Sequence, residues 1–102
     1  LVHRLMYSGD GEVERGRVPL AELVPQLCAQ LRNGNRQHHA ITLECQTEDL
    51  VVSADQAVAL TMFVVEAVTN AYLHAFAPQQ HGTITVEVTS EGETGVVAVS
   101  DN

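Results

Sequence analysis

The sequence contains no lysine, so its only permanently cationic side chains are five arginines, set against 13 aspartates and glutamates. Its formal net charge at pH 7 is −8. A surface of this sign repels nucleic acid and anionic lipid, and we expect neither as a partner. An anionic ligand would need a metal ion or the dipoles of nearby helices to offset the field.

Long apolar runs and paired cysteines are also scarce. No uninterrupted apolar run approaches the roughly 20 residues that cross a bilayer, and no secretory signal opens the chain. We therefore expect a cytoplasmic location, with a membrane anchor elsewhere in the parent protein left open. Cys28 and Cys45 lack the spacing of metal ligands, which favours buried thiols over a disulfide. A chain of 102 residues with 45% apolar content predicts one soluble domain with a single core.

The first 17 residues predict the end of a helix followed by a linker. Residues 1–7 look like the last turns of a helix that begins upstream. The glycines of residues 8–11 break this helix, and the polar stretch as far as Arg17 is the linker. The predicted division is therefore 1–17, helix end and linker, and 18–102, the N-terminal part of a folded domain.

The rest of the chain alternates between helical and strand periodicity. A helix is expected from Pro19 to about Asn35, with Pro25 either in its first turn or at a kink. Ser53 and Gln56 have the spacing of a capping box. The further elements expected are strands at 39–46 and 50–52, a helix at 54–76, and strands at 82–90 and 96–99 joined by a hairpin turn at 91–94. This order predicts an α/β (α+β) two-layer sandwich, with a mixed, mainly antiparallel sheet and helices on one face.

Glu66, Asn70 and His74 lie at four-residue steps along the predicted long helix. Such steps advance about 6 Å and drift about 40° around the axis, so the three polar groups form a stripe roughly 12 Å long. An acid, an amide and an imidazole suit hydrated magnesium and a polyphosphate, because Mg²⁺ needs only one or two protein oxygens beside substrate phosphates. The predicted core-facing residues of this helix are Leu60, Val64, Ala67, Val68 and Ala71.

Asp101 shares strand parity with Val97 and Val99, so its side chain leaves the sheet on their face. If that face packs against the long helix, Asp101 reaches the polar stripe. Its carboxylate could accept a hydrogen bond from an amino group such as the exocyclic amine of adenine. Asn70 and Glu66 each have a purely structural interpretation, as partners of another helix or of a backbone N–H. The combination of all four groups favours a nucleotide site.

The other histidines carry simpler interpretations. His38 and His39 stand at a junction between a loop and a strand, where solvation is the expected state. His81 is a loop residue beside Gly82. We expect none of these three to be a metal ligand.

The residues Glu66-x-x-x-Asn70-x-x-x-His74 resemble the N box of the ATP-binding domain shared by gyrase, Hsp90, histidine kinases and MutL. Asp101-Asn102 resembles the opening of the G1 box of that superfamily. Within the superfamily, the sequence is most similar to bacterial sensor histidine kinases of the HWE/HisKA_2 type. The residues that carry this narrower resemblance are Leu5-Met-Tyr7, Val18-Pro-Leu20, Leu27-Cys28 and Ala75-Phe76.

The resemblance implies a Bergerat-type ATP-binding fold and a role for each residue. Asn70 would ligate the Mg²⁺ that bridges the phosphates of ATP, and His74 would hydrogen-bond a phosphate. Glu66 would be the catalytic residue that orients or deprotonates the attacking group. Asp101 would recognise adenine, with Asn102 beside it in the cofactor site. The γ-phosphoryl would pass to a histidine on a separate helical domain of the same protein, and then to a response regulator.

The sequence departs from the family pattern at two places. Leu73 stands where relatives often carry lysine or arginine, so one cation for the phosphates is missing. The sequence ends before the G1 glycines and the nucleotide lid, so the resemblance implies a fold that is incomplete at its C-terminus and inactive alone. Relatives complete their sheet with a strand after the lid. We therefore expect residues 96–101 or a neighbour to expose a sheet edge, through which a homodimer or swapped oligomer could form.

Two alternatives stay open. One is a partner-sequestering module of the anti-sigma-factor serine kinase type, which Glu66-Ala-Val-Thr-Asn70 would also suit. The other is a degenerate, non-catalytic interaction domain. The gene upstream of Leu1 distinguishes the first from a histidine kinase: a helical hairpin with a histidine near its start supports the kinase, and a nearby start codon supports the sequestering module.

Overall fold

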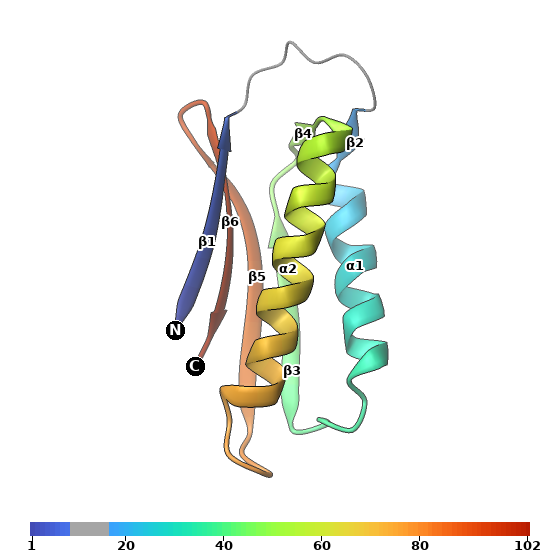
Figure 1. Ribbon diagram of the computed structural model, residues 1–102, viewed down its shortest axis with the longest axis vertical. Coiled ribbons are helices and arrows are strands. Elements are labelled where there is room, and N and C mark those ends of the chain that lie inside the picture. Colours follow the sequence, from blue (N-terminus) through green and yellow to red (C-terminus); the bar gives the residue numbers. More distant parts are fainter. Residues whose placement is uncertain (9–16) are drawn as a thin grey trace.

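Two helices cover one face of a four-stranded sheet, which gives the protein two layers (Figure 1). The computed structural model describes residues 1–8 and 17–102. Its elements are β1 (Val2–Ser8), β2 (Val18–Pro19), α1 (Leu20–Gly34), β3 (Ile41–Thr47), β4 (Val51–Val52), α2 (Ala54–His74), β5 (Gly82–Glu91) and β6 (Thr94–Asp101). The linker predicted over residues 9–16 lies outside the described residues, so the division into 1–17 and 18–102 stays a prediction.

The sheet runs in the order β1-β6-β5-β3, and a small separate ladder joins β2 to β4. β3 and β5 are parallel, whereas β5 pairs antiparallel with β6 and β6 with β1. The predicted fold class is therefore confirmed: the protein is an α+β two-layer sandwich with a mixed, mainly antiparallel sheet. The inward residues of the hairpin strands, Ile84, Val86 and Val88, are buried as their alternation predicts.

The prediction of a helix end at residues 1–7 is wrong, because these residues form strand β1. Leu5 pairs with Val97 and Tyr7 with Gly95 across an antiparallel ladder. Both side chains pack against the core, which is the two-residue periodicity of a half-buried strand. A helical turn or two has little stability of its own, so pairing with a neighbouring strand decides the conformation of so short a segment.

This pairing also changes which strands form the sheet edges. β6 lies between β1 and β5, so the prediction of an unpaired edge at residues 96–101 is wrong for that strand. The outer strands of the four-stranded sheet are β1 and β3. The homodimer or swapped oligomer expected from an open edge remains a prediction, now for the edge of β1.

The helices begin close to the places that the sequence predicts. Pro19 is the N-cap of α1, and Pro25 lies inside the helix, beyond the first turn, so the first-turn interpretation is wrong. α2 begins after Ser53, whose hydroxyl oxygen accepts a hydrogen bond from the Gln56 backbone N–H at 3.1 Å. The Ser53 backbone N–H donates in return to Gln56 Oε1 at 3.0 Å. The predicted capping box is therefore confirmed.

The predicted core face of α2 is also confirmed, since its five expected residues are all buried. By length and composition alone, α2 is apolar enough to cross a membrane, and no other helix among the described residues is. Its buried side chains belong to the core between helix and sheet. Cys28 and Cys45 are both free thiols, but only Cys28 is buried as predicted, whereas Cys45 is half-buried. Burial raises the pKa of the Cys28 thiol to about 12.

Removing the cap of α2 should weaken the domain measurably. We expect Ser53→Ala to lower the free energy of unfolding by about 1 kcal/mol, because the Gln56 N–H then loses its acceptor. Ser53→Asp keeps a capping oxygen and should lose only a few tenths of that value. Urea titration followed by circular dichroism measures both. An aspartate variant as unstable as the alanine variant would contradict the capping explanation.

Candidate functional site

Asn70, His74 and Asp101 line one cavity of about 150 Å³ between α2 and β6. Asp101 is therefore on the helix-covered side of the sheet, where its shared parity with Val99 predicts it. The other residues around the cavity are Ala67, Ala71 and Ala75 of the helical segment, Val99 of β6, and Leu1 and His3 at the start of the chain. The row of alanines at four-residue steps leaves the space, because short side chains there do not fill the gap between helix and strand.

Glu66 lies beside the cavity and does not line it. Its carboxylate Oε2 accepts a hydrogen bond from Asn70 Nδ2 at 3.3 Å. Both side chains are exposed, and the four-residue step along α2 brings them together. Because the amide nitrogen of Asn70 is engaged with Glu66, the amide oxygen is the group left to meet a cation or a donor.

The Asp101 carboxylate is half-buried, with 15% of its side-chain surface exposed. Its one polar partner among the described residues is the backbone nitrogen of Leu1, at 3.4 Å from Oδ1. An N–H···O hydrogen bond is normally about 2.7–3.2 Å between the heavy atoms, so this contact is long. The carboxylate can therefore accept a better-placed donor.

Asn102 is turned away from these groups. Its Oδ1 accepts a hydrogen bond from the Thr83 N–H at 2.9 Å, and its own N–H donates to the Thr83 carbonyl at 3.3 Å. It therefore extends the pairing of β5 with β6 by one residue. Of the five predicted site residues, three share the cavity, Glu66 adjoins it through Asn70, and Asn102 stands apart.

The side chains of Asn70, His74 and Asp101 suit a magnesium nucleotide, but the cavity that they line is small for one. Within residues 1–8 and 17–102, no three of the His, Cys, Asp and Glu side chains gather to hold a metal. Mg²⁺ would therefore need substrate phosphates beside a protein oxygen such as that of Asn70. Pockets for small ligands usually measure about 300–1,000 Å³. A cavity of about 150 Å³, walled on one side by Leu1 and His3, holds only part of a nucleotide.

A second, larger cavity is not indicated by the sequence. It measures about 670 Å³ and includes His38, His39 and His81, which the sequence suggests are unrelated solvated residues. The parallel pairing of β3 and β5 explains why the three histidines lie around one cavity, because Ile41 pairs with Gly82 where both strands begin. The loops that precede the two strands therefore lie at the same edge of the sheet. The alternating patterns of the strands, read one at a time, carry no signal for this pairing.

No family model matches the chain, and no curated protein is significantly similar to it in sequence. Solved structures that are similar in fold include two from Erythrobacter litoralis. The histidine kinase domain of the blue-light activated histidine kinase EL346 from Erythrobacter litoralis aligns with a TM-score of 0.73 and 25% identity, over 81% of this chain and 38% of that one. The EL346 kinase from Erythrobacter litoralis aligns with a TM-score of 0.72 and 25% identity, over 82% of this chain and 29% of that one.

The protein therefore has the fold of a histidine kinase domain. The resemblance indicated by the N box-like and G1-like residues is confirmed at this level, and the two neighbours are consistent with the HWE type. The chain spans well under half the length of either structure.

Proposed function

We propose that this chain is the ATP-binding portion of a two-component sensor histidine kinase. The observation that carries the proposal is the meeting of Asn70, His74 and Asp101 around one cavity between α2 and β6. The similarity in fold to a histidine kinase domain supports it. The acceptor would be a histidine on a separate helical domain of the same protein, and a response regulator would receive the phosphoryl group next.

In this proposal α2 supplies the groups for the metal and the phosphates. The Asn70 amide oxygen would ligate Mg²⁺, since its nitrogen is held by Glu66. The His74 imidazole, one helical turn further on, would donate a hydrogen bond to a phosphate oxygen. Glu66 would orient the attacking group or accept its proton, from the exposed side of Asn70.

Asp101 would hold the base at the other end of the cavity. A half-buried carboxylate with one long contact can accept a hydrogen bond from an exocyclic amine of adenine. When bound, Mg-ATP supplies the transferable γ-phosphoryl and the charge neutralisation that its transfer needs. The protein's part is mostly positioning, and four polar side chains on a rigid helix and strand are sufficient for that part.

A titration with ATP in the presence of Mg²⁺ tests the proposal. We expect Asn70→Ala to weaken binding about tenfold or more, because the proposed magnesium ligand is lost. Asn33→Ala is the matched control, since it removes the same exposed side chain from the end of α1. Isothermal titration calorimetry with and without Mg²⁺ measures the affinities, and the effect of Asn70→Ala should vanish when the metal is absent.

The same titration distinguishes the role of Asp101. ATP and inosine triphosphate differ at the exocyclic amine, so Asp101→Asn should reduce the preference for ATP over inosine triphosphate. Equal affinities in the wild type and in both variants would remove the proposed roles. No binding of either nucleotide, even by a longer protein that includes the nucleotide lid implied by the resemblance, would favour the degenerate interaction domain, which the small volume of the cavity also supports.

A further inference from the structure

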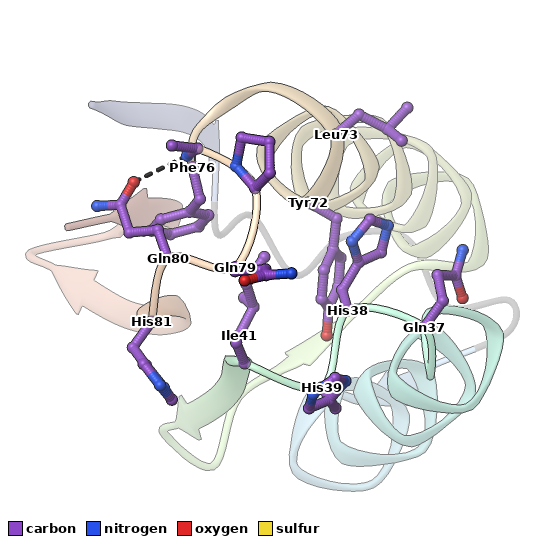
Figure 2. A pocket seen from close by; sticks show the side chains of 13 residues that line it. Gln37, His38, His39, Ile41, Tyr72, Leu73, Phe76, Gln79, Gln80 and His81 are labelled. Atoms are coloured by element: carbon purple, nitrogen blue, oxygen red, sulfur yellow. Dashed lines mark hydrogen bonds between the residues drawn. The ribbon is translucent and has the colours of Figure 1, made fainter.

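The larger cavity lies on the opposite flank of α2 from the proposed nucleotide site, and no residue lines both. Its volume of about 670 Å³ is within the usual range for small-ligand pockets. Figure 2 shows the side chains around it, which come from the end of α2, the loop that follows, and the loop before β3. The structure therefore contains a second cavity of ligand size, and none of its residues belongs to the proposed nucleotide site.

Close packing fixes the aromatic wall of this cavity. The ring of Phe76 rests directly on the backbone of Gly82, where any Cβ would overlap it. The Tyr72 side chain is almost completely buried, and its ring lies 5.5 Å from the His38 imidazole, centroid to centroid. Two rings from the α2 segment and one imidazole are thus held in place before any ligand arrives.

The turn at the cavity rim is also defined. The Gln80 N–H donates to the Ala77 carbonyl at 3.0 Å, and the Ala77 N–H donates to Gln80 Oε1 at 2.8 Å. Pro78 and Gln79 are the central residues of this turn, and Gln79 has a φ of 67°. Glycine or asparagine usually occupies such a position, because a larger side chain is strained there. Gln79 nevertheless presents its carboxamide at the rim (Figure 2).

The polar side chains that line the cavity can all donate hydrogen bonds. The chain has 13 carboxylate side chains, yet none lines this cavity. The polar side chains that do line it are imidazoles, carboxamides and one phenol, all of which can donate hydrogen bonds: Gln37, His38, His39, Tyr72, Gln79, Gln80 and His81. An anion would therefore meet hydrogen-bond donors here and no carboxylate among the residues that line the cavity.

We propose that this cavity binds a small aromatic anion, a planar ring bearing one carboxylate or sulfonate. The ring would pack against the half-buried side chains of Ile41 and Phe76, which line the space beside the buried Tyr72 (Figure 2). The acid group would lie at the rim, among the donors of Gln79 and His81. This inference is independent of the proposed kinase function, since the two cavities share no residue.

Three probes with one ring system and different charge test the proposal: 1-naphthoate, 1-naphthylmethanol and 1-naphthylmethylammonium. Titration of the isotope-labelled protein, followed by nuclear magnetic resonance, reports both affinity and location. We expect 1-naphthoate to bind with a millimolar or lower dissociation constant and to shift the ring resonances of His38, Tyr72 and Phe76. Its affinity should exceed that of the ammonium probe about tenfold. Naphthoate binding should persist with saturating Mg-ATP. The result for this cavity can then be interpreted independently of the result for the nucleotide site.

Charge at the rim provides the matched variants. Gln79→Glu replaces an amide by a carboxylate of the same size and should weaken naphthoate binding about tenfold. Gln26→Glu makes the same change on an exposed position of α1 away from the cavity, and it should alter the affinity less than twofold. Gly82→Ala should abolish binding, because the added Cβ pushes the Phe76 ring from its place.

Three results would overturn the proposal. The first is equal affinity for all three probes, which indicates unspecific apolar contact. The second is a set of shifts at the exposed apolar residues Val58 and Met62 of α2 in place of the cavity. The third is equal weakening by Gln79→Glu and Gln26→Glu, which would assign the effect to net charge alone.

Discussion

Leu60→Ala should lower the free energy of unfolding by about 2–5 kcal/mol, the largest change that we expect from a single truncation in this domain. Leu60 lies on α2 with 1% of its surface exposed, inside the cluster that joins both helices to the sheet. Alanine loses the transfer free energy of the removed carbons, and the surrounding side chains close the gap only in part. A domain of this size is typically stable by only about 5–15 kcal/mol, so the loss is a large fraction of the total.

Met62→Ala is the control for that experiment. Met62 is two residues further along the same helix, with 67% of its surface exposed, so its truncation should change stability by about 0.5 kcal/mol or less. Urea unfolding curves at 25 °C, followed by circular dichroism, give both values. A Met62 variant as unstable as the Leu60 variant would mean that the face of α2 that carries Met62 is buried against another part of the protein or a second molecule.

The sequence was sufficient to predict α2 because several local signals coincide there. The Ser53–Gln56 capping box sets its first residue, and apolar residues at helical spacing set its buried face. Strand parity placed Asp101 on the face of Val97 and Val99, and its position beside α2 follows because that face of β6 packs against the helices. Local periodicity thus predicts which face a residue occupies, wherever the element itself is long enough to be recognised.

Pairing between distant segments was not predictable in the same way. β3 and β5 are joined in parallel across the whole of α2, so nothing in either strand indicates that their preceding loops meet. This is why the three histidines of the larger cavity looked unrelated. The strand state of residues 1–7 depends on β6, which lies at the other end of the sequence. Apolar and polar residues do not alternate cleanly in this segment, because Met6 is apolar although 62% of its surface is exposed, so its pattern does not separate a helix end from an edge strand.

Gly95→Ala should destabilise the domain by about 1–3 kcal/mol through its effect on β1. Gly95 pairs with Tyr7, and a Cβ added at Gly95 would overlap the Tyr7 ring, which lies across the glycine backbone. Burial raises the pKa of Tyr7, and its buried hydroxyl finds no hydrogen-bond partner in the described part of the chain. The added methyl group must therefore displace either the ring or the strand.

A double-mutant cycle makes this prediction specific to the pairing of β1 with β6. In a Tyr7→Ala background, Gly95→Ala should become neutral or stabilising by up to about 1 kcal/mol, because alanine restricts the unfolded chain more than glycine does. The change of sign requires that Tyr7 covers Gly95. An unchanged cost in both backgrounds would mean that residues 1–7 leave β6 uncovered. The cavity beside Asn70 and His74 would then lose the wall formed by Leu1 and His3, and a nucleotide could approach Asp101 from that side.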